Sequence, residues 1–225
     1  VLKNIKIYQW KYKEEDFLQE NIPIADLIQS PDKFRSATNM FLISGWKKSD
    51  LAIKLQNQTS TVYSNLLNQV KRTINSLIKN HWSSHKKLKI ELEHRGDHLT
   101  IHLNEPGSST PPEFRSDGLK WFLTFLINFR AQSKDISNFI LLIDEPGLYL
   151  HPRGQKDALE EIENLAQNNQ IIYTTHQTFL INKNKPERVH IIKRETERKG
   201  QLAANPFYAS KVTDILDSKS ILTDR

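Results

Sequence analysis

The sequence contains no cysteine, a single methionine and only seven glycines among its 225 residues. The absence of cysteine excludes disulfide bonds and any zinc or iron–sulfur site built on thiolates. No apolar run reaches the roughly 20 residues of a membrane span, and the N-terminal segment does not have the pattern of a secretory signal. We therefore expect a soluble, cytoplasmic protein that has no membrane partner.

The scarcity of glycine also bears on nucleotide binding. A phosphate-binding loop of the Walker A type requires the pattern G-x-x-x-x-G-K-S/T, and none of the seven glycines begins it. The nearest combination is SGWKKSD at residues 44–50, in which the spacing is wrong. These residues are therefore not expected to cradle the phosphates of a nucleotide by themselves.

The charge of the chain is unevenly distributed. The formal net charge is +6, and residues 1–100 hold 16 Lys and Arg against 10 Asp and Glu, whereas residues 101–225 hold 16 of each. A basic surface over the first part would attract nucleic-acid phosphates. A solvated, lysine-rich face would give the same counts, so both interpretations stay open.

The first 112 residues predict a basic part made of a helical insert and an antiparallel hairpin. A strand-like segment lies at residues 4–12, and a helix is expected to open near Ser30-Pro31. Apolar residues recur at helical spacing from Thr59 to Trp82. Leucine and isoleucine alternate with polar residues on both sides of Arg95-Gly96-Asp97, which predicts a hairpin. The Pro/Gly/Ser-rich loop at 104–112 is a predicted boundary.

Residues 113–200 show a different pattern, in which helices alternate with buried strands. Helices are expected over 117–132 and 153–167, and strands over 139–143, 170–175 and the segment RVHIIKRE. Such alternation predicts an α/β fold with a mostly parallel sheet flanked by helices. Residues 201–225 are expected to form a short C-terminal helix and a tail.

Polar residues follow two of these strands at the point where each strand ends. Asp144 and Glu145 follow FILLI, and His176 comes shortly after QIIY. Ligands of open α/β sheets bind at the carboxyl ends of the strands. If the two strands are neighbours, the three side chains converge in an arrangement suited to phosphoryl transfer from a nucleotide to water. Asp144 would hold Mg²⁺, Glu145 would position the water, and His176 would donate to the transferred phosphate.

Simpler interpretations of these residues stay open. The residues Asp-Glu-Pro-Gly favour a turn, which the acidic pair would simply cap. His176 would then be a capping or surface histidine. Asp144 and His176 also form a conceivable metal pair. The histidines between residues 81 and 102 are interpreted as surface residues, not as a zinc site: His81, His85, His94, His98 and His102.

The segment RSDGLKWF, residues 115–122, adds a candidate anion site. A helix that begins at Ser116-Asp117-Gly118 would direct its backbone amides and the Ser116 hydroxyl at a phosphate, with Lys120 nearby. The alternative is an ordinary helix N-cap at Ser116 or Asp117.

Taken in order, Ser-x-Gly, ILLIDEP and YTTH resemble the C-terminal half of an ABC-type P-loop ATPase head. The resemblance points to the SMC and RecF-like branch and most closely to the OLD family. The segments FRSDGLKWFLTF, DEPGLYLHPRGQ and IIYTTHQTFLI carry it, and it extends over residues 113–194. It implies a head that binds ATP and Mg²⁺ and that pairs with a second head.

The resemblance also implies a role for each matching residue. Ser116 and Gly118 belong to the signature that meets the γ-phosphate of ATP bound by the partner. Arg115 and Lys120 lie beside it as further candidates for nucleotide binding. Asp144 corresponds to the Walker B carboxylate that holds Mg²⁺, Glu145 to the catalytic carboxylate and His176 to the switch histidine. The D-loop at the dimer interface corresponds to GLYLHP, with Gly147, Leu148 and His151.

The implied function is ATP hydrolysis by a homodimer or a higher even oligomer that controls DNA processing in bacterial anti-phage defence. Because the only methionine is Met40 and no Walker A pattern is present, we expect that loop upstream of Val1. A degenerate head is the alternative. A Toprim-type nuclease, if present, is expected downstream or on a partner chain. Two other functions stay open: a nucleic-acid-binding module with an inactive head, and a head in which ATP only glues dimers.

Overall fold

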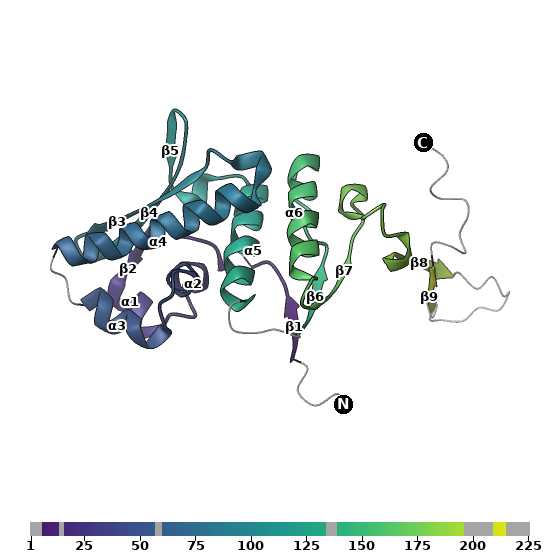
Figure 1. Ribbon diagram of the computed structural model, residues 1–225, viewed down its shortest axis with the longest axis horizontal. Coiled ribbons are helices and arrows are strands. Elements are labelled where there is room, and N and C mark those ends of the chain that lie inside the picture. The colour runs from purple at the N-terminus through teal and green to yellow at the C-terminus, as the bar shows by residue number, and fades with distance from the viewer. Residues whose placement is uncertain (1–5, 14–15, 57–59, 134–138, 196–208, 215–225) are drawn as a thin grey trace, which may run out of the picture. The chain divides into compact units, whose positions relative to one another are not determined.

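Two sheets organise the longer of the two compact units into which the chain divides, Val1–Leu180 and Ile181–Arg225. This computed structural model describes residues 6–13, 16–56, 60–133, 139–195 and 209–214. Figure 1 shows the order of the elements along the chain.

The first sheet consists of three parallel strands in the order β1-β6-β7. They are β1 (Lys6–Trp10), β6 (Phe139–Asp144) and β7 (Gln170–Thr174). The register of β6 and β7 ends with Asp144 opposite Thr174. The two strands that precede the acidic pair and the histidine are therefore neighbours, and both end at the same edge of the sheet.

One face of this sheet is covered by α5 (Asp117–Ser133) and α6 (Pro152–Leu165). On β6, Phe139, Leu141 and Ile143 alternate on the buried face. The ring of Trp10 packs edge-on against Trp121, Phe125 and Phe129 of α5, at centroid distances of 5.2, 5.4 and 5.6 Å. Full burial of such side chains contributes about 1.5–3 kcal/mol each. The predicted α/β fold, with a parallel sheet flanked by helices, is confirmed.

The second sheet is antiparallel and has the order β2-β4-β3, with β5 added to β4. Its strands are β2 (Asn21–Pro23), β3 (Lys89–Arg95), β4 (His98–Glu105) and β5 (Ser108–Thr110). The β3–β4 hairpin predicted around Arg95-Gly96-Asp97 is confirmed, and Gly96 there has φ +62°.

The loop at 104–112 does not separate the two compact units. It reverses at Pro106-Gly107 into a second hairpin, β4–β5, because Gly107 supplies the positive φ of +81° that the turn requires. The division between the units falls after Leu180 instead.

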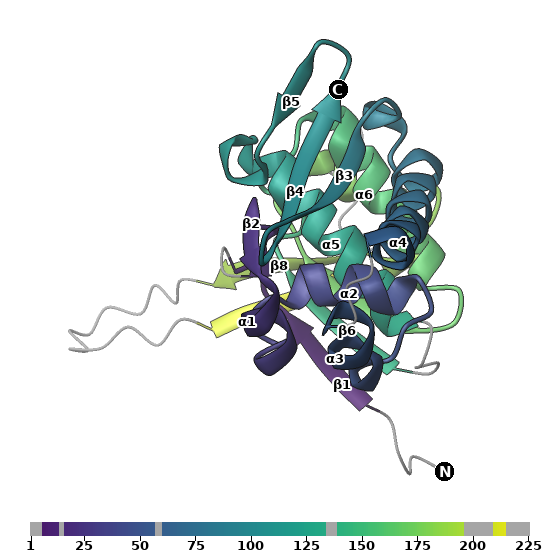
Figure 2. The ribbon, with the colours of Figure 1, turned by 90° about the vertical axis from the view of Figure 1, so that its left-hand side faces the viewer.

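Helix α4 (Ser60–His81) lies beside β3 and matches the amphipathic helix predicted from the sequence. Figure 2 shows α4 alongside β3 and the β4–β5 hairpin extending from the sheet. Asn75 of α4 bonds both backbone groups of Ile90, at 2.7 and 3.0 Å, and so satisfies part of the edge of β3.

Three shorter helices precede α4: α1 (Ile24–Gln29), α2 (Arg35–Ile43) and α3 (Lys48–Gln56). The helix expected from Ser30-Pro31 begins only at Arg35. The intervening residues form a turn, in which the Lys33 amide donates to the Ser30 carbonyl at 3.0 Å. The Thr38 hydroxyl donates to the Pro31 carbonyl at 2.7 Å and fixes that turn against α2.

The shorter unit contains a hairpin of β8 (His190–Glu195) and β9 (Ala209–Asp214). The segment RVHIIKRE is a strand as predicted, but it pairs antiparallel with β9 rather than joining the parallel sheet. The helix predicted within 201–225 is wrong for Ala209–Asp214. Val212 and Thr213 there are β-branched and pair with Ile192 and Ile191, which favours a strand. Residues 201–208 and 215–225 lie outside the described residues.

Candidate functional site

The edge where β6 and β7 end is held together by one hydroxyl group. Thr174 Oγ1 donates to Asp144 Oδ1 at 2.6 Å and accepts a hydrogen bond from the Glu145 amide at 3.2 Å. A single side chain of β7 therefore fixes both members of the acidic pair. Sequence reasoning missed Thr174, although its place at the end of a strand next to the one carrying Asp144 was a usable signal.

Glu145 is the one described residue other than glycine with a positive φ, at +46°. This left-handed conformation costs about 1–2 kcal/mol for such a residue, and strain of this kind is concentrated at functional sites. Glu145 Oε2 accepts a hydrogen bond from the His176 amide at 3.1 Å, and Oε1 lies 3.2 Å from His176 Nε2. The side chains of Glu145 and His176 therefore converge, as the sequence led us to expect.

The two residues differ sharply in exposure. The side chain of Glu145 is 24% exposed, whereas that of His176 is 90% exposed. Glu145 is thus held in a partly enclosed position and can be oriented by its neighbours. The imidazole of His176 is accessible to a ligand over most of its surface.

The acidic pair fits Mg²⁺ by the chemistry of its donors. Mg²⁺ is usually held by one or two carboxylates together with substrate phosphates. Asp144 is exposed at the strand end, and the Thr174 bond engages only its Oδ1. In the part of the chain that the structure describes, no three His, Asp or Glu side chains gather into a metal site. His176 contacts Glu145, and the metal pair of Asp144 and His176 stays a prediction.

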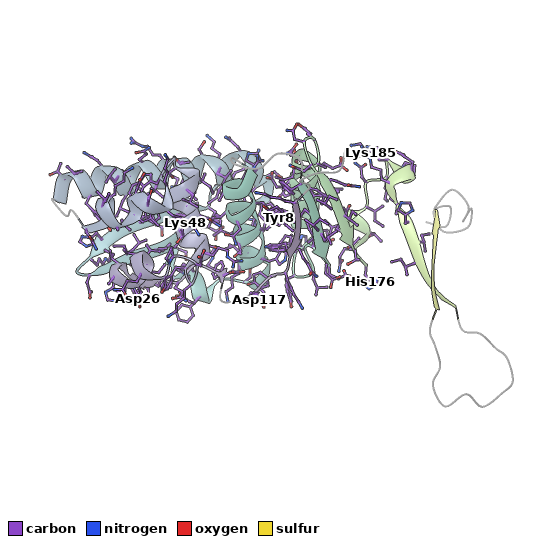
Figure 3. The ribbon with its side chains drawn as sticks, turned by 90° about the horizontal axis from the view of Figure 1, so that it is seen from below. Tyr8, Asp26, Lys48, Asp117, His176 and Lys185 are labelled. Carbon is purple, nitrogen blue, oxygen red and sulfur yellow. The ribbon has the colours of Figure 1, made fainter. Side chains whose placement is uncertain are left out.

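Ser116 is the N-cap of α5, as one of the two sequence interpretations proposed. Its Oγ accepts a hydrogen bond from the Leu119 amide at 3.4 Å, and its carbonyl accepts one from the Lys120 amide at 3.0 Å. Ser116 and Asp117 are both exposed. The hydroxyl proton of Ser116 remains to be donated, so capping and phosphate binding are compatible. Asp117 and His176 lie along the same edge in the view of Figure 3.

Arg115 and Lys120 are engaged in local contacts. Arg115 forms an ion pair with Glu105 of β4, and its side chain is 13% exposed. The ammonium of Lys120 lies 3.7 Å from Asp117 Oδ1 and 6.0 Å from the ring centroid of Phe17. These contacts anchor the start of α5, and nucleotide binding by the two cations stays a prediction.

The predicted signature, at Gly118, and the predicted D-loop, at Tyr149, approach each other closely. A Cβ added to Gly118 would lie 2.5 Å from the Tyr149 carbonyl oxygen, so only glycine allows this approach. Gly147 has φ +70° and opens the turn, which the Leu150 amide closes onto the Gly147 carbonyl at 2.9 Å. This turn begins at the glycine of Asp-Glu-Pro-Gly, and the simpler turn interpretation of the acidic pair stays open.

Part of the predicted D-loop is accessible. Leu148 and Tyr149 are 50% and 55% exposed, and His151 is exposed at the N-cap of α6. Gly147 and Leu150 are buried.

The segment after His176 forms a single 3₁₀ turn, Thr178–Leu180. The Tyr173 hydroxyl donates to the Leu180 carbonyl at 2.6 Å and anchors this turn. Burial raises the pKa of Tyr173, and the nearby Glu163 raises it further. The phenol therefore keeps the proton that this hydrogen bond needs.

The histidines of the first part are half-buried rather than surface residues. His81 lies 2.9 Å from Glu161 Oε2, and His102 lies 2.8 Å from Glu20 Oε1. The ring of His85 packs on Trp82 at 4.5 Å, and burial lowers its pKa. None of these contacts approaches the acidic pair.

Within the described ranges, no helix combines the length and apolar character needed to cross a membrane.

Comparison with known proteins gives one curated relative and several solved structures. The uncharacterized protein MJECL43 of Methanocaldococcus jannaschii is 32% identical in an alignment of 134 residues that covers 56% of this chain. The chain spans about a third of that relative, since the matched part is 35% of its length.

Similar solved structures include heads of SMC proteins. A structure titled for ATP-driven dimerisation and DNA-stimulated activation of SMC ATPases is 15% identical with a TM-score of 0.47, over 72% of this chain and 93% of the other. The Smc head of Pyrococcus furiosus bound to the C-terminal domain of ScpA is 17% identical with a TM-score of 0.42, over 88% and 50%.

The family is shown by a model described as "AAA domain, putative AbiEii toxin, Type IV TA system", which matches residues 2–182. This range includes Ser116, the acidic pair and the histidine after β7. The matched residues make up most of the 225-residue sequence. The chain therefore belongs to this AAA-domain family.

Proposed function

We propose that this chain is part of an ATPase whose two copies enclose ATP and hydrolyse it with Glu145 as the catalytic carboxylate. The observation that carries the proposal is the conformation of Glu145. Its strained backbone is held by Thr174, and its carboxylate is held by His176, at the shared end of two parallel strands. Family membership in an AAA-domain group supports the same reaction class.

The roles of the residues follow from their positions. Asp144 would hold Mg²⁺, and the ion would neutralise charge on the β- and γ-phosphates. Glu145 would orient the attacking water and accept its proton. The exposed Nε2 of His176 would leave Glu145 and donate a hydrogen bond to the transferred phosphate, where negative charge develops.

The phosphate loop must come from elsewhere, because this sequence lacks the pattern. We place it on another segment of a longer chain. Among the described residues β7 pairs only with β6, so its outer edge can accept a further strand. The relative's greater length leaves room for such a segment.

A second copy completes the site in this proposal. The resemblance to ABC-type heads assigns Ser116 to the γ-phosphate of ATP bound by the partner copy. Ser116 at the start of α5 and Leu148 and Tyr149 of the D-loop segment are exposed, and the two segments approach closely at Gly118. They would therefore be presented to a partner as one surface.

The biological role we propose is control of DNA processing in anti-phage defence, as a member of the OLD branch. An effector such as a nuclease would lie on another domain or chain. The basic excess of residues 1–100 supports a DNA contact. Affinity of the full-length protein for DNA should then fall steeply between about 50 and 200 mM salt, through counterion release. A flat salt response in filter binding would remove the DNA contact from the proposal.

ATP-dependent dimerisation tests the proposal directly. We expect full-length wild-type protein with Mg²⁺ and a slowly hydrolysed ATP analogue to form dimers in light scattering. Ser116→Arg should abolish them, because a bulky side chain would occupy the place of the partner's γ-phosphate.

Ser109→Arg is the matched control, since Ser109 is exposed on β5 of the β4–β5 hairpin and outside the predicted site. That variant should dimerise as wild type does. If Ser116→Arg dimerises normally with the analogue, the proposal that two copies build the ATP site is wrong. Dimers that form with negligible turnover by wild-type protein would instead favour a head in which ATP only glues two copies.

A further inference from the structure

A buried glutamine at the start of α6 links the D-loop to the segment that carries His176. Gln155 is 4% exposed. Its Nε2 donates to the Leu150 carbonyl at 3.0 Å and to Gln177 Oε1 at 3.0 Å. Leu150 ends the D-loop turn, and Gln177 directly follows His176. Both amide protons of one side chain are therefore used on two different loops.

The surroundings of Gln155 restrict how it can move. The Gln155 amide donates to the His151 carbonyl at 3.0 Å, so its backbone is fixed in the first turn of α6. Its Cγ lies 3.8 Å from the position that a Cβ on Gly147 would occupy. Gln177 is fixed in turn, because its amide donates to Thr175 Oγ1 at 3.0 Å and its carbonyl accepts from the Leu180 amide at 3.1 Å.

Leu150, the D-loop residue of this link, is tightly packed. The Leu150 side chain is packed among three glycines, at 3.5, 3.2 and 3.3 Å from the Cβ positions of Gly118, Gly147 and Gly154. A shift of the D-loop or of the signature helix must therefore move Leu150. The Leu150 carbonyl would transmit that shift to Gln155 and then to the loop of His176.

We propose that Gln155 is a positioning residue that couples the D-loop surface to the placement of His176. Contact of a second copy with Leu148 and Tyr149 would thereby set the position of the histidine beside Glu145. This inference rests on the proposed function for its consequence, but the link itself is a property of a single copy.

The first test measures the link without ATP. Hydrogen exchange of the full-length protein is compared for wild type, Gln155→Met and the matched control Gln167→Met, which lies in an exposed position after α6. Methionine keeps the length of glutamine and removes both donors. We expect Gln155→Met to accelerate exchange about 10-fold at the Gln177 and Leu180 amides and at the Leu150 amide, but not within β6. Unchanged exchange in all three would overturn the link.

The second test asks whether the link acts through His176. Gln155→Met is expected to lower kcat for ATP about 10-fold with KM within about twofold, and Gln167→Met should leave both unchanged. In a His176→Ala background the same change should have no further effect on kcat. Losses that multiply in the double variant would mean that Gln155 acts only on general structure, and the proposal would fail.

The outcomes separate this inference from the proposed function. If wild-type protein does not hydrolyse ATP while exchange still responds to Gln155→Met, the proposed function fails and the link stands. If wild-type protein hydrolyses ATP and Gln155→Met matches it in both kcat and exchange, the link fails and the proposed function stands.

Discussion

Replacement of Glu145 with glutamine is expected to lower ATP turnover by the full-length protein at least about 100-fold, the range over which a positioned general base contributes. Glutamine has nearly the same shape, and its carbonyl oxygen can still accept the hydrogen bond from the His176 amide. It cannot accept a proton from the attacking water. The expected change is therefore in the chemical step, with the fold retained.

The design of this experiment depends on a second readout. ATP-dependent dimers should persist in Glu145→Gln and live longer than in wild type, because the nucleotide that joins the copies is not consumed. Glu160→Gln is the matched control, since Glu160 is exposed on the same helix as Gln155 and outside the proposed site. It should keep wild-type turnover. Wild-type turnover by Glu145→Gln would remove Glu145 from the chemistry.

Replacement of Gly118 with alanine is expected to destabilise the protein by about 1–3 kcal/mol, the usual cost of forcing an extra methyl group into a packed site. The added Cβ would lie 2.5 Å from a backbone oxygen of Tyr149, which cannot rotate away as a flexible side chain could. Alanine also has a higher helix propensity than glycine, which stabilises the helix by about 1 kcal/mol. This gain offsets only part of the destabilisation.

Gly154→Ala provides the contrast. Gly154 also lies in the first turn of a helix, but its Cβ would meet only side-chain atoms of Leu150, at 3.3 Å and beyond. We expect its urea midpoint to stay close to that of wild type. Gly118→Ala should lower the midpoint and also weaken ATP-dependent dimerisation, because the D-loop must move. Equal midpoints for wild type and Gly118→Ala would contradict the close approach of the two segments.

The sequence was sufficient to predict the elements that have a clear local pattern, either a short apolar run or a helical period. FILLI and QIIY are short apolar runs with polar residues at their ends, and they form adjacent strands that place Asp144 opposite Thr174. The amphipathic pattern between Thr59 and Trp82 forms α4. These features depend on local patterning and on the rule that parallel strands share an edge.

Other features could not be predicted because they depend on contacts between distant segments. The approach of Gly118 to Tyr149 and the two bonds of Gln155 require the final packing of α5 and α6. The ion pair between Arg115 and Glu105 requires the β4–β5 hairpin, which the Pro/Gly-rich composition had indicated as a loop. In the second unit, the strand at Ala209–Asp214 depends on its pairing with β8, and the β-branched residues Val212 and Thr213 were too few to predict it alone.

The central claim is that each ATP site is built from two copies, and mixing two inactive variants tests it most directly. Full-length Ser116→Arg and Glu145→Gln are each expected to be inactive alone. In a mixed dimer, the Glu145 of the first variant faces the intact signature of the second. An equal mixture should therefore regain turnover that neither variant has alone, because each mixed dimer has one intact site of two. No recovery, with mixed dimers shown to be present, would contradict the account.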